Sequence, residues 1–203
     1  VSRDHSISIS KLPGTDIEIM SLVGGKWTTF RAFSQEVDDL ILTRMGRRRI
    51  RETVDLRIGG GVNYPSDGAA RSEYLGKLIM KSPLSSERVG VLFERYGTKI
   101  EPYFDQLTTG ETPLASCPSY SAEELNWITE KEHVVRLSDL LFRRTEIALS
   151  GSLTEQVIEE VGQLVGITAG WDEERAAIEK EHVRAMAIRS SIKLNGTGAA
   201  AYA

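Results

Sequence analysis

The sequence contains one cysteine, Cys117, so no disulfide bond can form within the chain. No apolar run approaches the roughly 20 residues that a membrane-spanning helix requires. Basic residues (25) are fewer than acidic residues (29), which argues against a broad nucleic-acid-binding surface, and the basic run at 47–51 is interpreted as a solvated turn. His133 and His182 have no second ligand at metal spacing, so we interpret them as structural and expect no metal site. What remains, with 40% hydrophobic and 27% charged residues, is typical of one medium-sized or two small globular domains.

The most informative segment spans residues 17–31. An apolar run at 17–23 is followed by Gly24, Gly25 and Lys26, and helical periodicity begins at Phe30, which predicts a strand, a tight turn and a helix. Glycines allow close approach of a ligand to the backbone, and the first N–H groups of a helix lack partners within it. Such a helix start, with Lys26 beside it, attracts an anion. Taken alone, the pattern also fits a plain strand-to-helix turn with a solvated lysine.

Two motifs resemble those of one enzyme family. Residues 2–5 (Ser-Arg-Asp-His) and 24–31 (Gly-Gly-Lys-Trp-Thr-Thr-Phe-Arg) resemble the end of the flavin-binding domain of FAD-dependent glycerol-3-phosphate dehydrogenases. Residues 134–145, which end in Phe-Arg-Arg-Thr, resemble an element of the family's C-terminal helical domain. The resemblance implies oxidation of sn-glycerol 3-phosphate at C2 to dihydroxyacetone phosphate, with a hydride passing to FAD and the electrons onward to quinone or oxygen. It is weak between residues 46 and 110.

The resemblance also implies roles for individual residues. Arg3 corresponds to an arginine that holds the substrate phosphate, a task suited to a planar, permanently charged side chain. His5 corresponds to a family position that also accepts tyrosine, so the resemblance favours a role in orientation or hydrogen bonding over proton abstraction. No residue is assigned as the catalytic base. Thr29 is expected mainly to cap the helix. The residues expected to bind FAD are Gly24, Gly25, Lys26, Trp27 and Thr28.

The G-x-G-x-x-G turn of a dinucleotide-binding domain does not occur in the sequence. We therefore interpret the chain as the C-terminal portion of a longer enzyme, whose partner is the missing N-terminal FAD-binding half, and expect it to be inactive alone. The resemblance further implies a cytoplasmic location, with peripheral contact to the inner membrane and a homodimer both left open.

Composition and periodicity predict a mainly α fold, in which a β-strand, turn and helix precede an all-α bundle of five or six helices joined by short loops. We expect residues 1–46 to form the incomplete end of the FAD- and substrate-binding domain and 64–190 the helical domain. Residues 47–63 are expected to be a linker, and 191–203 a loose tail.

Polar residues that suit N-caps mark several of these helices. The last predicted helix has a weak apolar stripe, and its glutamates are interpreted as a solvated face. Arg143 and Arg144 are expected to bond carboxylates such as Glu130 or Glu132, with a positive rim near the anionic substrate as the functional alternative. The predicted helix starts are Ser85, Ser121 (a capping box with Glu124), Ser138 (with Leu141, Ile147 and Leu149 inward), Thr154 and Asp172; the stripe is Ala176, Ile178, His182, Ala185 and Ile188.

Two other functions stay open from the sequence. The chain could be a non-catalytic helical interaction module, in which the strand and first helix are structural remnants. It could also belong to a related FAD-dependent amine or amino-acid oxidase, which needs no phosphate-binding arginine.

Overall fold

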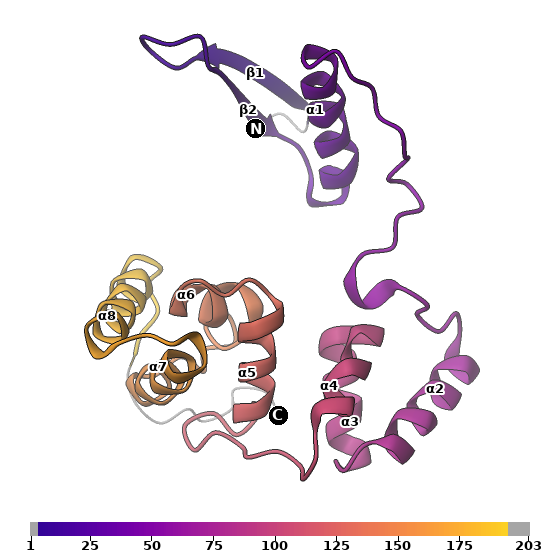
Figure 1. Ribbon diagram of the computed structural model, residues 1–203, viewed down its shortest axis with the longest axis vertical. Helices are drawn as coiled ribbons and strands as arrows, with labels where there is room; N and C mark the ends of the chain where they lie inside the picture. Colours follow the sequence, from indigo (N-terminus) through magenta and orange to yellow (C-terminus); the bar gives the residue numbers. More distant parts are fainter. Residues whose placement is uncertain (1–3, 195–203) are drawn as a thin grey trace. The chain divides into compact units, whose positions relative to one another are not determined.

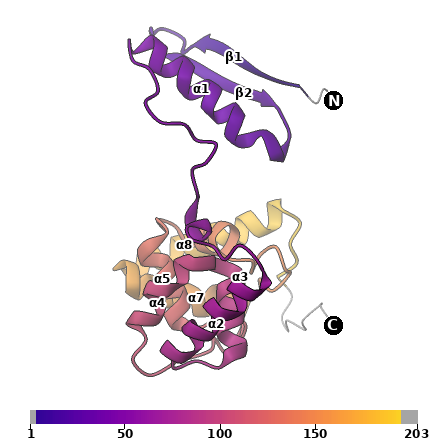
Figure 2. The same ribbon diagram turned by 90° about the vertical axis from the view of Figure 1, so that its right-hand side faces the viewer.

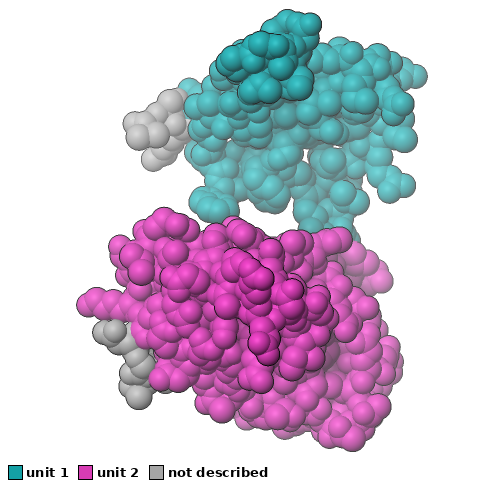
Figure 3. All heavy atoms as spheres, turned by 60° about the vertical axis from the view of Figure 1, so that its left-hand side comes forward, with its two compact units in different colours: residues 1–58 teal, residues 59–203 magenta. Residues whose placement is uncertain are grey.

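The computed structural model describes residues 4–194, and contacts divide the chain after Ile58 into two units, coloured separately in Figure 3. Helices dominate, and one two-stranded sheet occurs among the described residues. The predicted mainly α fold is therefore confirmed.

The first unit begins with a β-hairpin made of β1 (His5–Lys11) and β2 (Glu18–Gly24). His5 lies opposite Gly24 and Lys11 opposite Glu18, so the isoleucines of β1 share one face and its serines the other. Helix α1 (Phe30–Arg44) lies beside the hairpin (Figure 1), and Met20, which is opposite Ile9, lines a hollow with Val37, so the helix faces the isoleucine side. At one end of this face the rings of His5 and Phe33 lie 4.4 Å apart, and at the other Arg44 Nε bonds Glu18 Oε2 at 2.5 Å.

Helix α1 makes contacts on two faces, one toward the hairpin and one toward segment 49–56. Phe33 and Val37 are buried, whereas the neighbouring stripe of Arg31, Gln35 and Asp39, spaced four residues apart, holds the returning segment 49–56 along the helix. The contacts of this stripe are Arg31 with the carbonyls of Thr53, Val54 (3.1 Å) and Leu56 (2.9 Å), Gln35 with the Thr53 hydroxyl, and Asp39 with Arg49 (2.9 Å).

The second unit is a helical bundle (Figure 2). Helix α2 packs on α3, α7 packs on α5 and α8, and α6 packs on α8. The fifteen-residue stretch 107–121 between α4 and α5 departs from the expected short loops. The helices are α2 (Gly68–Lys81), α3 (Ser86–Tyr96), α4 (Glu101–Gln106), α5 (Ala122–Lys131), α6 (Leu137–Asp139), α7 (Glu155–Ala169) and α8 (Glu173–Arg189).

Local signals placed most helix starts correctly. The side chains of Ser85, Ser121, Thr154 and Asp172 each accept a hydrogen bond from the backbone N–H three residues later. The apolar faces behind these caps form one core, which includes Val89, Leu92, Phe93, Leu125, Ile128, Leu137, Leu141, Ile147, Val157, Val161, Val165 and Val183. Ile192 and Leu194, which belong to the tail expected to be loose (191–203), pack against this core, so that expectation is wrong for these two residues.

Three expectations about side chains in the bundle are wrong. Ser138 does not cap a helix, because it lies inside α6, whose N-cap is Arg136; Asp139, also inside α6, accepts the N–H groups of Val135 and Arg136. Leu149 points to solvent because the helix ends in a π-helical turn, Leu140–Arg144, before reaching it. The stripe predicted for α8 is also displaced.

In α8 the buried residues are Glu179, Val183 and Ala187, whereas Ile178 and Ile188 are exposed. Glu179 is fully buried, and it accepts the N–H of Leu137 at 3.1 Å and pairs with Arg175 at 2.8 Å. A glutamate that we assigned to a solvated face therefore caps α6 from a neighbouring helix.

The sequence did not reveal a close approach between two glycines. A Cβ on Gly60 would lie 2.0 Å from the carbonyl oxygen of Tyr96 and 2.9 Å from Cα of Gly97. Gly97 ends α3 with φ of 58°, in the region that favours glycine. The start of the second unit is therefore held against the end of α3 through backbone contact.

Candidate functional site

The turn between β2 and α1 requires glycine. Gly24 and Gly25 have φ values of 79° and 93°, which side chains disfavour. A Cβ on Gly24 would also lie 2.5 Å from the carbonyl oxygen of Asp4. Glycine is therefore needed at Gly24 because the turn packs against the chain's own backbone, and both glycines also line the hollow described below.

The residues after the glycines form a tight turn that leads into the helix. The Lys26 N–H donates to Thr29 Oγ1 at 3.1 Å, and the Thr29 hydroxyl donates to the Lys26 carbonyl at 2.9 Å. Thr29 is at the N-cap position of α1, as expected, but its hydroxyl closes the turn and makes no capping hydrogen bond to the first turn of the helix.

A hollow lies over this turn, lined by residues of β2, the turn and α1. The Trp27 side chain is 95% exposed beside it. Within residues 4–194, no carboxylate lies at ion-pair distance from Lys26, so its charge is not neutralised locally. An aromatic ring, an ammonium group and bare backbone therefore meet at one opening, a combination that suits a planar, electron-rich ligand. The lining residues are Leu22, Gly24, Gly25, Lys26, Trp27, Phe30, Phe33 and Ser34.

His5 lies next to the turn but is engaged elsewhere. Its Nε2 is 3.0 Å from Glu36 Oε2, and its ring packs against Phe33. This pair fixes the orientation of the imidazole. Arg3, the expected phosphate-binding residue, lies outside the described residues.

No group of three His, Cys, Asp or Glu side chains between residues 4 and 194 could hold a metal ion. Over the same residues, no helix has the length and apolar character needed to cross a bilayer.

The largest polar cluster of the second unit surrounds a buried carboxylate, Glu124 of α5. Glu124 has no exposed surface, and it accepts hydrogen bonds from Arg88 (2.6 Å), Arg95 (3.0 Å) and the Tyr96 hydroxyl. Because these groups occupy its carboxylate, Glu124 does not bond the backbone N–H of Ser121. The Ser121 half of the predicted capping box is therefore present, and the Glu124 half is wrong. Burial, reinforced by the Glu124 charge, raises the pKa of Tyr96 and keeps it a neutral donor.

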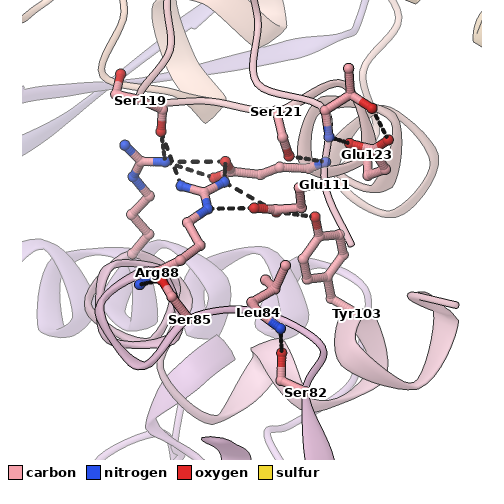
Figure 4. Close-up of polar contacts among 12 residues, drawn as sticks. Ser82, Leu84, Ser85, Arg88, Tyr103, Glu111, Ser119, Ser121 and Glu123 are labelled. Atoms are coloured by element: carbon pink, nitrogen blue, oxygen red, sulfur yellow. Dashed lines mark hydrogen bonds and ion pairs between the residues drawn. The ribbon is translucent and has the colours of Figure 1, made fainter. Parts of the chain in front are cut away.

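A second carboxylate, Glu111, extends this cluster toward the loop before α5 (Figure 4). Arg88 binds it through two nitrogens, at 2.5 and 3.1 Å, and Tyr103 donates its hydroxyl. Burial alone would raise the pKa of Glu111, but the hydrogen bonds from Arg88 and Tyr103 outweigh it and hold the pKa below its ordinary value. The cluster ties α3, the 107–121 loop and α5 together.

The comparisons with known proteins fit this architecture. The family model for the C-terminal domain of alpha-glycerophosphate oxidase matches residues 51–176. The chain belongs to this family. The matched range contains α2 to α7 and with them the whole Glu124 cluster.

Curated relatives of this family member carry the name glycerol-3-phosphate dehydrogenase. The chain is 26% identical over 191 residues to the mitochondrial protein of Mus musculus, covering 89% of the chain and 24% of that protein. It is 23% identical over 209 residues to the mitochondrial protein of Saccharomyces cerevisiae, with 89% and 30% covered. Glycerol-3-phosphate dehydrogenase 2 of Mycobacterium tuberculosis is 26% identical over 194 residues, with 92% and 31% covered. The chain thus spans about a quarter to a third of these relatives, and the family resemblance inferred from its motifs is confirmed.

The family's arginine pair lies on the π-helical turn. Arg143 bonds Asp139 at 2.6 Å, and Arg144 Nε donates to the backbone carbonyl of Glu132 at 2.8 Å. Our expectation of bonds to the carboxylates of Glu130 or Glu132 is wrong, because the carboxylate of Glu132 is taken by Lys99. Arg144 thus fastens the turn to the end of α5, whereas Arg143 pairs within its own segment with Asp139 of α6.

Proposed function

We propose that the full-length protein containing this chain is an FAD-dependent oxidoreductase that oxidises sn-glycerol 3-phosphate to dihydroxyacetone phosphate. Electrons then pass to quinone or oxygen. The names of the relatives support the substrate, and the turn at 24–29 is the observation that supports a flavin. The chain itself contributes part of the site.

The residues of the turn fit one edge of the cofactor. Gly24, Gly25 and Trp27 line the hollow, and Thr28 is exposed but is not among the lining residues. FAD, when bound, accepts the hydride released from C2 of the substrate. The unpaired ammonium of Lys26, together with the N-terminus of α1, stabilises negative charge on the reduced ring electrostatically.

Two further residues act on the substrate side in this proposal. Arg3 binds the phosphate through paired hydrogen bonds and so positions C2. His5, held by Glu36 and Phe33, keeps a fixed orientation beside the turn and can hydrogen-bond the substrate. We assign it a positioning role.

The test uses the full-length protein and two variants. Arg3→Ala should raise KM for glycerol 3-phosphate about 10- to 100-fold with little loss of flavin, because hydrogen bonds to charged groups contribute about 1.5–3 kcal/mol. Lys26→Met should lower the flavin reduction potential, because a positive charge that favours the reduced anion is removed. Lys11→Met is the matched control, since Lys11 pairs with Asp16 at the other end of the hairpin.

A colourless full-length protein would contradict the proposal and favour a helical interaction module. Equal losses of flavin and substrate affinity in Arg3→Ala would remove the phosphate role. Flavin reduction by an amine or amino acid, with none by glycerol 3-phosphate, would favour the oxidase alternative. The chain of 203 residues alone is expected to be colourless and inactive.

A further inference from the structure

A basic strap follows α1, and we define it as residues 46–51. Gly46 turns the chain with φ of 66°, and the Arg47 N–H bonds the Leu42 carbonyl at 2.8 Å, which closes the end of the helix. Arg49 then pairs with Asp39 at 2.9 Å and with Glu52 at 2.5 Å. The strap is thus anchored to α1 by one of its four arginines.

The other three arginines of the strap are not neutralised. Arg47, Arg48 and Arg51 are all exposed, and within residues 4–194 no carboxylate lies at ion-pair distance from any of them. The chain as a whole carries a net charge of -4, so these three charges run against its overall balance. Our interpretation of the basic run at 47–51 as a solvated turn does not explain why three unpaired arginines lie together.

The strap also borders a hollow of about 750 Å³. Asp38 is the one carboxylate among the lining residues, so the opening is strongly cationic. Ile50 projects from the middle of the strap with 98% of its surface exposed. The lining residues are Asp38, Leu42, Gly46, Arg47, Arg48, Arg49, Ile50, Arg51 and Thr53.

We propose that the strap binds a ligand bearing phosphate groups with at least two negative charges. Guanidinium groups match phosphate oxygens in pairs, and three unpaired arginines around one acidic residue favour a dianion over a monoanion. The same chemistry is presented by a free diphosphate and by the headgroups of an anionic lipid surface. The inference does not depend on the flavin site, because none of the strap residues lies in the turn at 24–29.

The experiment titrates the 203-residue chain with inorganic pyrophosphate and inorganic phosphate by calorimetry at low ionic strength. In parallel, the chain is sedimented with vesicles of phosphatidylcholine alone or mixed with phosphatidylglycerol. The test variant is the triple Arg47→Gln, Arg48→Gln, Arg51→Gln, which spares the anchoring Arg49.

The matched control variant is the triple Lys81→Gln, Lys131→Gln, Arg189→Gln. These three residues are exposed and have no ion pair in the described part of the chain. Their substitution removes the same charge as the strap variant, but from the second unit. Circular dichroism is the check that both variants remain folded.

Pyrophosphate, which has a second phosphoryl group and more negative charge than inorganic phosphate at neutral pH, should bind at least tenfold more tightly, with binding lost in the strap variant and kept in the control. If a lipid is the source, only the vesicles with phosphatidylglycerol should sediment the chain, and affinity should fall about fivefold for each arginine removed. Ile50→Ser would then weaken vesicle binding but leave pyrophosphate binding unchanged. Absence of binding in both arms, or equal losses in the strap and control variants, would overturn the proposal.

Discussion

Replacing Glu124 by glutamine tests the reasoning about the buried cluster. The glutamine keeps the shape and one acceptor oxygen but loses the charge that Arg88 and Arg95 share. Breaking a buried ion pair from one side costs about 3–5 kcal/mol, because the remaining charge is left uncompensated.

The structure places this substitution at the lower end of that range. Arg88 keeps Glu111 as a partner, and the arginine side chains are 17–19% exposed, so water partly compensates them. We expect a loss of about 3 kcal/mol in the free energy of unfolding of the second unit. For a unit of this size, that corresponds to a fall in Tm of about 10 °C.

Urea unfolding of the 203-residue chain measures the effect. Far-UV circular dichroism follows the helices, and tryptophan fluorescence reports on the three tryptophans, of which Trp127 is buried with its ring 5.4 Å from that of Tyr96. Glu130→Gln is the control, because Glu130 lies on the same helix in an exposed position and should change stability by less than about 0.5 kcal/mol. A loss below about 1 kcal/mol for Glu124→Gln would show that desolvation cancels the pairing, and the argument would fail.

Three other perturbations follow from the geometry. The depressed pKa of Glu111 contributes stability that is present above the unfolded pKa of about 4.3 and is lost as pH falls through the folded pKa. In urea unfolding, the free energy of unfolding of Glu111→Gln should therefore decline less below about pH 4 than that of the unchanged chain. Gly60→Ala should lower the unfolding free energy by more than about 2 kcal/mol because its Cβ overlaps backbone, whereas Gly61→Ala, with open space, should be near neutral in the same assay. Gly24→Ala should disturb the hairpin more than Gly14→Ala, measured by amide hydrogen exchange, because both have positive φ but only Gly24 faces a close backbone atom; equal effects would mean that the contact with Asp4 is unimportant.

Features that depend on neighbours in sequence could be predicted. Ser85, Thr154 and Asp172 cap their helices because an N-cap needs only a short polar side chain and an N–H three residues away. The turn at 24–29 was predicted for the same reason, since positive φ and a helix start are local properties.

Features that depend on distant partners could not be predicted. Glu124 follows Ser121 at capping-box spacing, but two arginines of α3, 29 and 36 residues away, bind it more strongly. Glu179 is buried because the N-terminus of α6 and Arg175 satisfy it, and no pattern within α8 signals this. The contact between Gly60 and Gly97 is likewise invisible without the fold.

The two faces of α1 restrict how this helix can change in length. Removing one residue between Arg31 and Asp39 would rotate everything beyond it by about 100°, since each residue advances the helix by that angle. Phe33 and Val37 could then no longer both face the hairpin while Arg31 and Asp39 both hold segment 49–56. Single insertions and deletions should therefore be excluded from this stretch in functional variants, and tolerated in the hairpin tip at residues 12–17.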